Sequence, residues 1–421
     1  MKSSETQKSK SIKVAFVGQT APYTKEFYSQ PGYGRAGSLA QLGFIEALHC
    51  SDVGLDCAWG FRPIAHWPKT KIQFELTRHE ILPCGAKITL MPLVNHFILR
   101  ELSRFFILPW FIVSWSLKRI GHPRVLVSYN LTQPNGVTWL RALTWLTHTK
   151  LVPVVYDLAQ ITTLRKPLHF RMVEPDWLDR VHEKTLPCCD GLMPITDAIA
   201  QDFAPALRYL RVDGGIGDSV VQNLPTITVR KDNGSLILFY AGSMDAWNGI
   251  PLMLEYFRKN TQKDLQLFLA GGGREESQVK DAALHDPRIT YFGFVGPEKL
   301  QELYGRADIL LNIRDIVDPG LKYHYPSKTF EMLAMGRPLI TSNSSHTKTE
   351  YGKYCKVMES CTLEAFDDAI SFFIRMSPDE RCEYGKRARE FALSERSWRS
   401  WGKKIGPYIR AIALGGGECN E

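Results

Sequence analysis

Short apolar runs alternate with amphipathic segments along the first half of the chain. Apolar runs at 12–17, 124–129 and 151–156 are bounded by polar and turn residues, and residues 38–48 carry apolar positions at helical spacing. Runs of about four to eight apolar residues are typical of strands in a parallel sheet, because helices cover both faces of such a sheet. This half is therefore predicted to be a parallel α/β domain.

The second half repeats the alternation, with predicted strands in 236–240, 265–270, 289–294 and 307–313. A strand, a glycine turn and a helix thus open both halves. At 421 residues the chain exceeds the size at which a single core stops growing, so two Rossmann-like, doubly wound domains are predicted. The predicted divisions are a disordered tail at 1–11, an N-terminal acceptor domain at 12–222, a linker at 223–235, a C-terminal nucleotide-sugar domain at 236–396, and a crossing helix and tail at 397–421.

Residues 322–340, with the sequence KYHYPSKTFEMLAMGRPLI, hold the clearest motif. Pro326 and Ser327 lie where a loop turns into a helix, since proline pre-sets the backbone of a first turn and serine supplies a capping oxygen. Gly336 and Pro338 form the usual stop signal before a short apolar strand. The motif is predicted to be a loop, a short helix and a strand.

The start of this helix is a candidate site for a phosphate. Helix starts present N–H groups and a partial positive charge, so they favour anions. Lys328 in the first turn is unfavourable there unless an anion is present, and a diphosphate is such an anion. Glu331 does not fit the capping-box spacing from Ser327, so it is either a solvated surface glutamate or a carboxylate that accepts hydrogen bonds from a ribose.

Two further patterns place polar groups or glycines just after predicted strands. Gly242 and Ser243 follow the run at 236–240 and precede a helical pattern, an order that brings backbone close to a phosphate. Asp157 follows the run at 151–156, where a carboxylate can serve as a general base or accept a hydrogen bond from a sugar hydroxyl. The alternative for Asp157 is a cap on the next turn.

Together these features resemble the nucleotide-sugar-binding motif of the GT-B glycosyltransferases, in particular glycosyltransferase family 4, the glycosyl transferases group 1. The resemblance implies a GT-B fold, with two Rossmann-like domains facing a cleft and a C-terminal helix that crosses back to the first domain. It also implies that Glu331 binds the donor ribose. The residues that it assigns to the diphosphate are Ser327, Lys328, Gly242 and Ser243.

The resemblance extends to the remaining loops and to the chemistry. It implies that Gly272 and Val295 lie in the loops beside the nucleobase, and that Asp157 and Lys328 are the catalytic residues. It further implies transfer with retention, without a metal ion and without a cofactor other than the nucleotide-sugar donor.

Three positions depart from the family pattern. Tyr323 stands where the family often has a second glutamate, and Ser243 and Asn248 replace an arginine and a lysine that offset diphosphate charge. The alternative sources of that charge are Lys328 together with Lys322 or Arg314. The other interpretation of these replacements is that the protein hydrolyses and transfers the donor only weakly.

The net charge of +8 is uneven, because residues 1–225 carry 25 Lys and Arg against 18 Asp and Glu, and residues 226–421 carry 27 against 26. Within the basic half, the segment 94–119 contains an apolar run of 13 residues that is interrupted by Pro109, which is too short to span a bilayer. Its flanking arginines and internal tryptophans are typical of a helix on an anionic membrane surface. A helix packed on a parallel sheet also needs a wide apolar face, so both interpretations stay open.

The sequence thus favours a glycosyltransferase that moves a sugar from a nucleotide sugar to a glycan or lipid-linked acceptor, in cell-surface polysaccharide synthesis. Two alternatives remain: a nucleotide-sugar epimerase of the same fold, and a non-catalytic, membrane-associated partner of a polysaccharide assembly complex. Nine scattered cysteines without a CxxC pair, and a polar start without an apolar core, predict a cytoplasmic protein. Peripheral binding at the inner face of the plasma membrane is left open, and no nucleic acid partner is expected.

Overall fold

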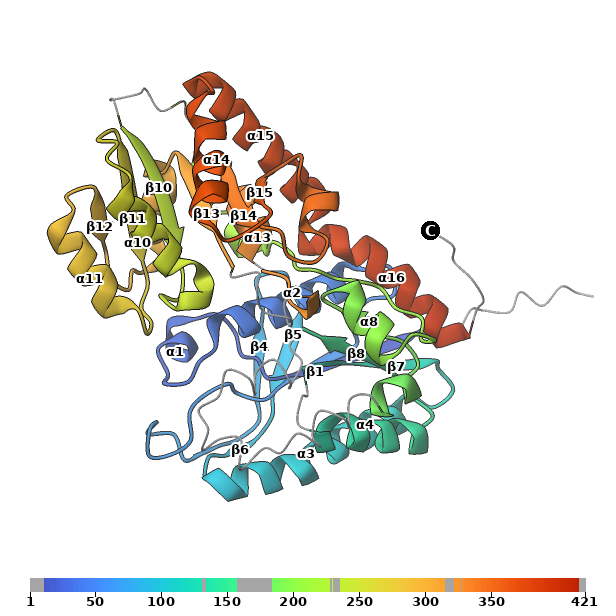
Figure 1. The fold of residues 1–421 in the computed structure, drawn as a ribbon. Helices are drawn as coiled ribbons and strands as arrows, with labels where there is room; N and C mark the ends of the chain where they lie inside the picture. The colour runs from blue at the N-terminus through green and yellow to red at the C-terminus, as the bar shows by residue number, and fades with distance from the viewer. Residues whose placement is uncertain are drawn as a thin grey trace, which may run out of the picture. The chain divides into compact units, whose positions relative to one another are not determined.

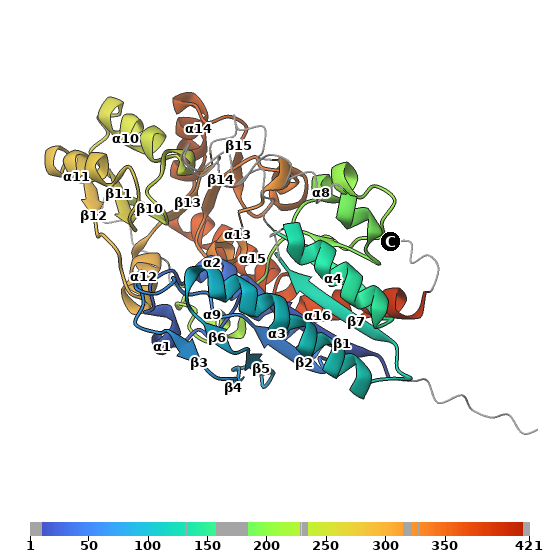
Figure 2. The ribbon, with the colours of Figure 1, turned by 90° about the horizontal axis from the view of Figure 1, so that it is seen from below.

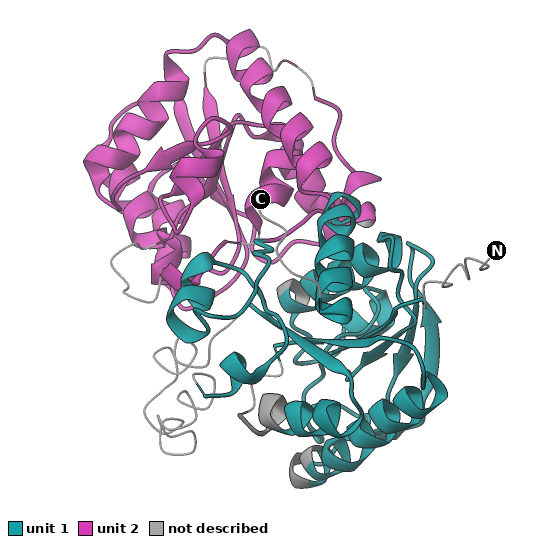
Figure 3. Cartoon of the chain, turned by 90° about the vertical axis from the view of Figure 1, so that its right-hand side faces the viewer, with its two compact units in different colours: residues 1–213, 398–421 teal, residues 214–397 magenta. Residues whose placement is uncertain are grey.

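The computed structural model of the chain describes residues 11–130, 134–156, 184–227, 229, 235–314, 322–326 and 328–415. The chain divides into two compact units (Figure 3): unit 1 comprises Met1–Asp213 and Trp398–Glu421, and unit 2 comprises Gly214–Ser397. Each unit contains a mainly parallel sheet with helices packed on its faces (Figure 1). The predicted fold of two Rossmann-like α/β domains is confirmed.

The sheet of unit 1 has the strand order β4-β5-β2-β1-β7-β8-β9. Neighbours pair in parallel except β4 and β5, and Val14 lies opposite Val125 at the centre. The strands are β1 (Lys13–Gly18), β2 (Cys57–Gly60), β4 (Arg78–Ile81), β5 (Lys87–Leu90), β7 (Arg124–Tyr129), β8 (Lys150–Val155) and β9 (Met193–Pro194). A separate antiparallel pair joins β3 (Phe74–Glu75) to β6 (Leu93–Val94).

The two faces of this sheet are covered by different helices (Figures 1 and 2). On one face, Ile112 of α3 and Leu140 of α4 pack with Ala15 and Val17 of β1 in one apolar cluster. The other face is covered by α2 and α16. The helices in the described part of unit 1 are α1 (Lys25–Tyr28), α2 (Arg35–Cys50), α3 (Phe97–Lys118), α4 (Pro134–Leu146), α8 (Asp197–Phe203) and α16 (Trp398–Leu414), with a 3-10 turn at Leu186–Cys188.

Helix α16 follows unit 2 in the sequence but packs in unit 1, against α2. A Cβ atom on Gly402 would lie 2.7 Å from the Ala47 carbonyl oxygen, so only glycine allows the two helices to approach this closely. Tyr408 fixes the helix further, because its hydroxyl accepts from the Leu192 N–H at 2.7 Å. The expected return of the last helix to the first domain is confirmed.

The sheet of unit 2 is entirely parallel, in the order β12-β11-β10-β13-β14-β15. Helices α10, α11 and α14 pack on one face, and α12 and α13 connect strands over the other, as right-handed crossovers require. The strands are β10 (Leu236–Ala241), β11 (Leu265–Ala270), β12 (Ile289–Tyr291), β13 (Ile309–Asn312), β14 (Leu339–Ser342) and β15 (Lys356–Met358). The helices are α9 (Asp218–Val221), α10 (Ile250–Lys259), α11 (Glu276–His285), α12 (Pro297–Arg306), α13 (Lys328–Ala334), α14 (Leu363–Ile374) and α15 (Pro378–Glu395).

Candidate functional site

The strand order of unit 2 changes direction at β10. The chain runs outward from β10 to β11 and β12, and then returns to the other side of β10 as β13. In doubly wound sheets, ligands bind outside the carboxyl ends of the strands at such a point. The candidate site is therefore defined by the loops that follow β10 and β13, which contain Gly242 and Ser243 on one side and Arg314 on the other.

The loops after β10 and β11 are packed against each other through their backbones. A Cβ atom on Gly271 would lie 1.8 Å from the Gly242 carbonyl oxygen, and the φ of Gly271 is +137°, so this position requires glycine. The N–H groups of Gly242 and Met244 donate to the carbonyl oxygens of Ala270 and Gly272, both at 3.0 Å. The structure thus places the predicted Gly242 and Gly272 in adjacent loops.

Ser243 lies exposed at the tip of the loop after β10, and its side chain is already engaged. Its hydroxyl donates to the Asp245 carboxylate. Its carbonyl oxygen accepts from the Tyr240 hydroxyl at 2.9 Å and from Asn248 Nδ2 at 2.7 Å. The Ser243 N–H has no hydrogen-bond acceptor among the described residues, so it is the group of Ser243 that can donate to an anion.

Sequence reasoning missed Asp245. Its carboxylate is buried, and it also accepts from the Arg274 N–H at 3.3 Å. The sequence does contain a signal for Asp245: Ser243, Asp245 and Asn248 lie close together after a strand. Side chains of these types readily form hydrogen bonds with nearby backbone. These contacts hold the loop in shape, and they place a carboxylate beside the position where the resembled family has a cation.

Helix α13 is tied to the carboxyl end of β13. Asn312 Nδ2 donates to Thr329 Oγ1 at 3.0 Å, and this hydroxyl donates to the Pro326 carbonyl at 2.7 Å. Lys328 and Glu331 are the two residues of the helix that are not buried, and at i and i+3 they share one face. The buried residues of the helix are Thr329, Phe330, Met332, Leu333 and Ala334. The predicted Lys328 and Glu331 are therefore accessible together beside the candidate site.

Arg314 follows β13, and hydrogen bonds hold its backbone on both sides of the peptide unit. Its N–H donates to Ser342 Oγ at 2.9 Å, and its carbonyl accepts from Ser342 Oγ and Cys361 Sγ, both at 2.8 Å. Burial raises the pKa of Tyr240 to about 12, and the positive charge of Arg314 lowers this pKa in part. The charge of Arg314 therefore acts on the hydroxyl that supports the Ser243 loop.

The loop after β12 joins the same edge of the sheet. The Gly271 N–H donates to the Gly293 carbonyl oxygen at 2.8 Å, which connects this loop to the one after β11. Val295 lies in the loop and is partly exposed. Two other predicted site residues, Asp157 and Ser327, lie outside the described residues.

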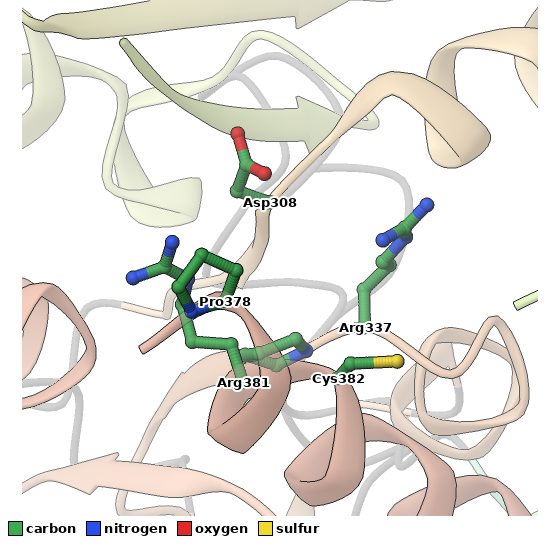
Figure 4. A pocket seen from close by; sticks show the side chains of 6 residues that line it. Asp308, Arg337, Pro378, Arg381 and Cys382 are labelled. Carbon is green, nitrogen blue, oxygen red and sulfur yellow. The ribbon is translucent and has the colours of Figure 1, made fainter. Parts of the chain in front are cut away.

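A small pocket lies at the amino ends of β13 and β14, opposite the carboxyl ends where the candidate site lies (Figure 4). It is lined by Asp308 before β13, by Arg337 and Pro338 before β14, and by α15 residues including Arg381 and Cys382. These are the amino ends of the strands, where doubly wound sheets do not place their ligands. The pocket is therefore separate from the candidate site.

Residues 235–375 match the family model described as Glycosyl transferases group 1. This stretch contains the loops after β10, β11, β12 and β13 as well as α13. The match confirms, for this part of the chain, the resemblance drawn from the sequence. The comparison with curated proteins gives no match.

Solved structures with the same fold cover almost the whole chain. Sucrose-phosphate synthase from Thermosynechococcus elongatus is 17% identical, with 96% of this chain and 100% of that chain covered and a TM-score of 0.64. Anabaena HepE in complex with UDP-glucose is 12% identical, with 95% and 99% covered and a TM-score of 0.60. A UDP-forming α,α-trehalose-phosphate synthase from Burkholderia xenovorans in complex with glucose-6-phosphate is 11% identical, with 95% and 99% covered and a TM-score of 0.63. The chain thus has the GT-B fold, and residues 235–375 of its second unit carry the sequence signature of the group 1 glycosyl transferases.

Proposed function

We propose that the protein is a glycosyltransferase that moves a sugar from a nucleotide-sugar donor, bound by unit 2, to a glycan or lipid-linked acceptor, bound by unit 1. The observation that carries this proposal is the point between β10 and β13 where the strand order changes, because the loops there fall within the stretch that matches the group 1 family. Two of the structural relatives support a donor of this class, since one was solved with UDP-glucose and another is named as UDP-forming.

In the proposed complex, unit 2 holds the donor through groups at the carboxyl edge of its sheet. Glu331 accepts hydrogen bonds from the ribose, and the Ser243 N–H, Ser327 and Lys328 face the diphosphate. Gly242 faces the diphosphate, and Gly272 lies beside the nucleobase. Val295 lies beside the nucleobase.

Catalysis is proposed to come from positioning and from charge compensation on the departing diphosphate. Lys328, together with Arg314, carries the compensating charge on unit 2. Asp157 contacts the transferred sugar or the acceptor hydroxyl. We also propose that transfer retains configuration and needs no metal ion; a relative of the same fold, trehalose-6-phosphate synthase, was studied for transfer with retention.

We further propose that the reaction belongs to cell-surface polysaccharide synthesis and takes place in the cytoplasm, at the inner face of the plasma membrane. The basic first half of the chain supports this location, because it carries 25 Lys and Arg against 18 Asp and Glu in residues 1–225.

The donor site is tested by calorimetry with UDP and other nucleoside diphosphates on the wild type and on Glu331→Ala and Lys328→Ala. We expect each substitution to weaken binding by about tenfold or more, because a hydrogen bond to a charged group contributes about 1.5–3 kcal/mol. Lys299→Ala and Glu302→Ala are matched controls, since these residues form an exposed i, i+3 pair on α12. Their affinities should equal that of the wild type.

Two results would contradict the proposal. One is a wild-type protein that binds no nucleoside diphosphate. The other is a Glu331→Ala variant with unchanged affinity, which would remove the assigned donor site. Turnover of a nucleotide sugar in the absence of any acceptor, with the sugar released as an epimer, would instead identify an epimerase.

A further inference from the structure

Helix α3 of unit 1 buries one apolar face, with Leu108, Ile112 and Trp115, and exposes a second one. A surface helix normally turns its apolar stripe to the core and its charged residues to water. In α3, two arginines face the protein, and the stripe that faces solvent is made of leucine, phenylalanine and tryptophan. Such a face is unfavourable in water, so it indicates contact with an apolar partner.

The arginines of α3 point into unit 1 and contact its interior. Arg100 is buried, and one of its guanidinium nitrogens donates to the Ile64 carbonyl at 2.7 Å and to Asn95 Oδ1 at 3.2 Å. One turn later, the Arg104 guanidinium lies 4.9 Å from the centre of the Phe61 ring. Because these contacts fix the rotation of the helix, the outward direction of its apolar stripe is built into the fold.

The outward stripe runs along most of the helix. Leu102, Phe106, Trp110 and Leu117 follow one another at spacings of four, four and seven residues, which places them on one face. Their side chains are 51%, 69%, 74% and 61% exposed.

Helix α4 extends this apolar surface. Figure 2 shows α4 alongside α3, and Phe105 of α3 stacks on Trp139 of α4 with ring centres 4.6 Å apart. Trp145 and Leu146 at the end of α4 are 67% and 65% exposed. The α3–α4 surface is defined here by Leu102, Phe106, Trp110, Leu117, Trp145 and Leu146.

The chain around this surface is poor in acidic residues, and α3 itself contains one, Glu101, directly before Leu102. From Leu102 to Tyr156 the sequence contains no Asp or Glu, and its basic residues are Arg104, Lys118, Arg119, Arg124, Arg141 and Lys150. Asp56 pairs with Arg119, and Asp190 pairs with Arg141 and Lys150. Lys118 is exposed and has no ion pair among the described residues. The surface therefore combines exposed aromatic and aliphatic side chains with a net positive charge.

We propose that the α3–α4 surface binds an anionic lipid membrane, with α3 lying flat and its apolar stripe at the boundary between headgroups and acyl chains. Aromatic and leucine side chains suit this boundary, and nearby basic residues are attracted to anionic headgroups. No helix in the described part of the chain is long and apolar enough to cross a bilayer. The binding is peripheral and does not depend on the proposed transferase activity.

A second copy of the chain fits this surface less well. In a symmetric dimer the same patch faces itself, so the basic residues of one subunit meet those of the other. Like charges brought together at an interface oppose association, whereas an anionic membrane complements them.

The proposal is tested by sedimentation of the full-length protein with vesicles of phosphatidylcholine and phosphatidylglycerol, and with vesicles of phosphatidylcholine alone. We expect binding to the anionic vesicles that weakens at high salt, because screening shortens the reach of surface charges. The double variant Phe106→Glu, Trp110→Glu should bind anionic vesicles more weakly than the wild type by at least about tenfold. Both positions are exposed, so the variant should keep the thermal stability of the wild type.

Leu284→Glu is the matched control, because Leu284 is an exposed leucine on α11 of unit 2. Its vesicle binding should equal that of the wild type. Lys118→Glu should weaken binding to anionic vesicles while leaving the protein folded. Trp110 gives a second readout: the blue shift of fluorescence on vesicle addition should shrink in Trp110→Phe, because Trp110 moves from water to lipid.

Several outcomes would overturn the proposal. Failure of the wild type to sediment with anionic vesicles is one, and equal binding of the double variant is another. If the protein bound neutral vesicles as tightly as anionic ones, the proposed attraction between basic residues and anionic headgroups would be excluded. A dimer in sedimentation equilibrium that the double variant abolishes would show that a second copy covers this surface.

Discussion

Ser243 and Asn248 stand where the resembled family has two cations, and the structure shows what they do instead. Asn248 donates to the Ser243 carbonyl oxygen, and the Ser243 hydroxyl donates to Asp245. Both side chains therefore maintain the shape of the loop after β10, and neither brings positive charge to it. In the proposed reaction the compensating charge comes from outside this loop, and we expect Arg314 and Lys328, which lie beside β13, to supply it.

The effect of Arg314 on the donor can be measured separately. Arg314→Ala should lower kcat by about 100-fold, because one group that stabilises developing charge typically contributes that much. Arg314→Lys should restore part of the rate, since it keeps the charge. Arg258→Ala, which changes an exposed arginine of α10, serves as control and should leave kcat unchanged. A normal kcat in Arg314→Ala would assign the compensation to Lys328 alone.

Whether a site residue could be predicted from the sequence depends on how far apart in the chain the residues that it contacts lie. The sequence placed Gly242, Ser243 and Gly272 after strands, because strand ends and glycine turns are local signals. It singled out Lys328 as a cation in the first turn of a short helix, and Glu331 because it has no capping role and matches the family motif. The sequence offered Arg314 as one of several cations that could offset diphosphate charge and did not choose between them. Its proximity to Tyr240 depends on the pairing of β10 with β13, which no local pattern reveals.

At the scale of elements, periodicity predicts a helix better than it predicts which face is buried. The segment around α3 was expected to be helical, but its rotation depends on acceptors in other parts of unit 1, such as the Ile64 carbonyl that binds Arg100. A last helix was predicted within 397–421, and α16 spans Trp398–Leu414 because its amphipathic pattern is continuous. Its attachment to α2 and to β9 rests on distant contacts that no local pattern records.

The attachment of α16 can be tested with Tyr408→Phe. The substitution removes the hydroxyl that accepts from the buried Leu192 N–H, which keeps the Arg208 carbonyl oxygen as a second acceptor at 3.1 Å. The loss should therefore be that of an ordinary hydrogen bond, about 0.5–1.5 kcal/mol. Urea unfolding followed by tryptophan fluorescence reports this loss, since every tryptophan except Trp247 belongs to unit 1. Tyr28→Phe removes an exposed hydroxyl and should change the midpoint little. An unchanged midpoint in Tyr408→Phe would show that the contact adds nothing to the stability of unit 1.

At the scale of the whole molecule, both units rely on carboxylates that are paired with arginine. A hydrogen bond from Arg78 lowers the pKa of Glu26 in unit 1, and one from Arg288 lowers the pKa of Asp286 in unit 2. For Asp56, burial alone would raise the pKa, but hydrogen bonds from Arg119 and Trp115 outweigh burial and lower it. These groups bind fewer protons in the folded protein than in the unfolded chain at mildly acidic pH.

The protein should therefore lose stability in acid. A carboxyl group with a lowered folded pKa contributes its full stabilisation above its unfolded pKa of about 4, and loses it as the pH falls through the folded value. The free energy of unfolding should thus fall between about pH 5 and pH 3. Asp56→Asn should be less stable than the wild type at neutral pH, and the difference should shrink in acid. Asp368→Asn, at an exposed position, is the control. A difference that is equal at all pH values would mean that Asp56 does not act through its charge.

The return of α16 to unit 1 has a consequence for synthesis on the ribosome. All of unit 2 is translated before α16, although α2 needs α16 to cover the surface around Gly43 and Ala47. At about 5–20 residues per second, the ribosome takes roughly 10 to 40 s to pass from the first part of unit 1 to its last helix. During that interval unit 2 can finish folding, while unit 1 exposes an apolar helix face. We therefore expect nascent chains of this protein to bind chaperones near the ribosomal exit tunnel.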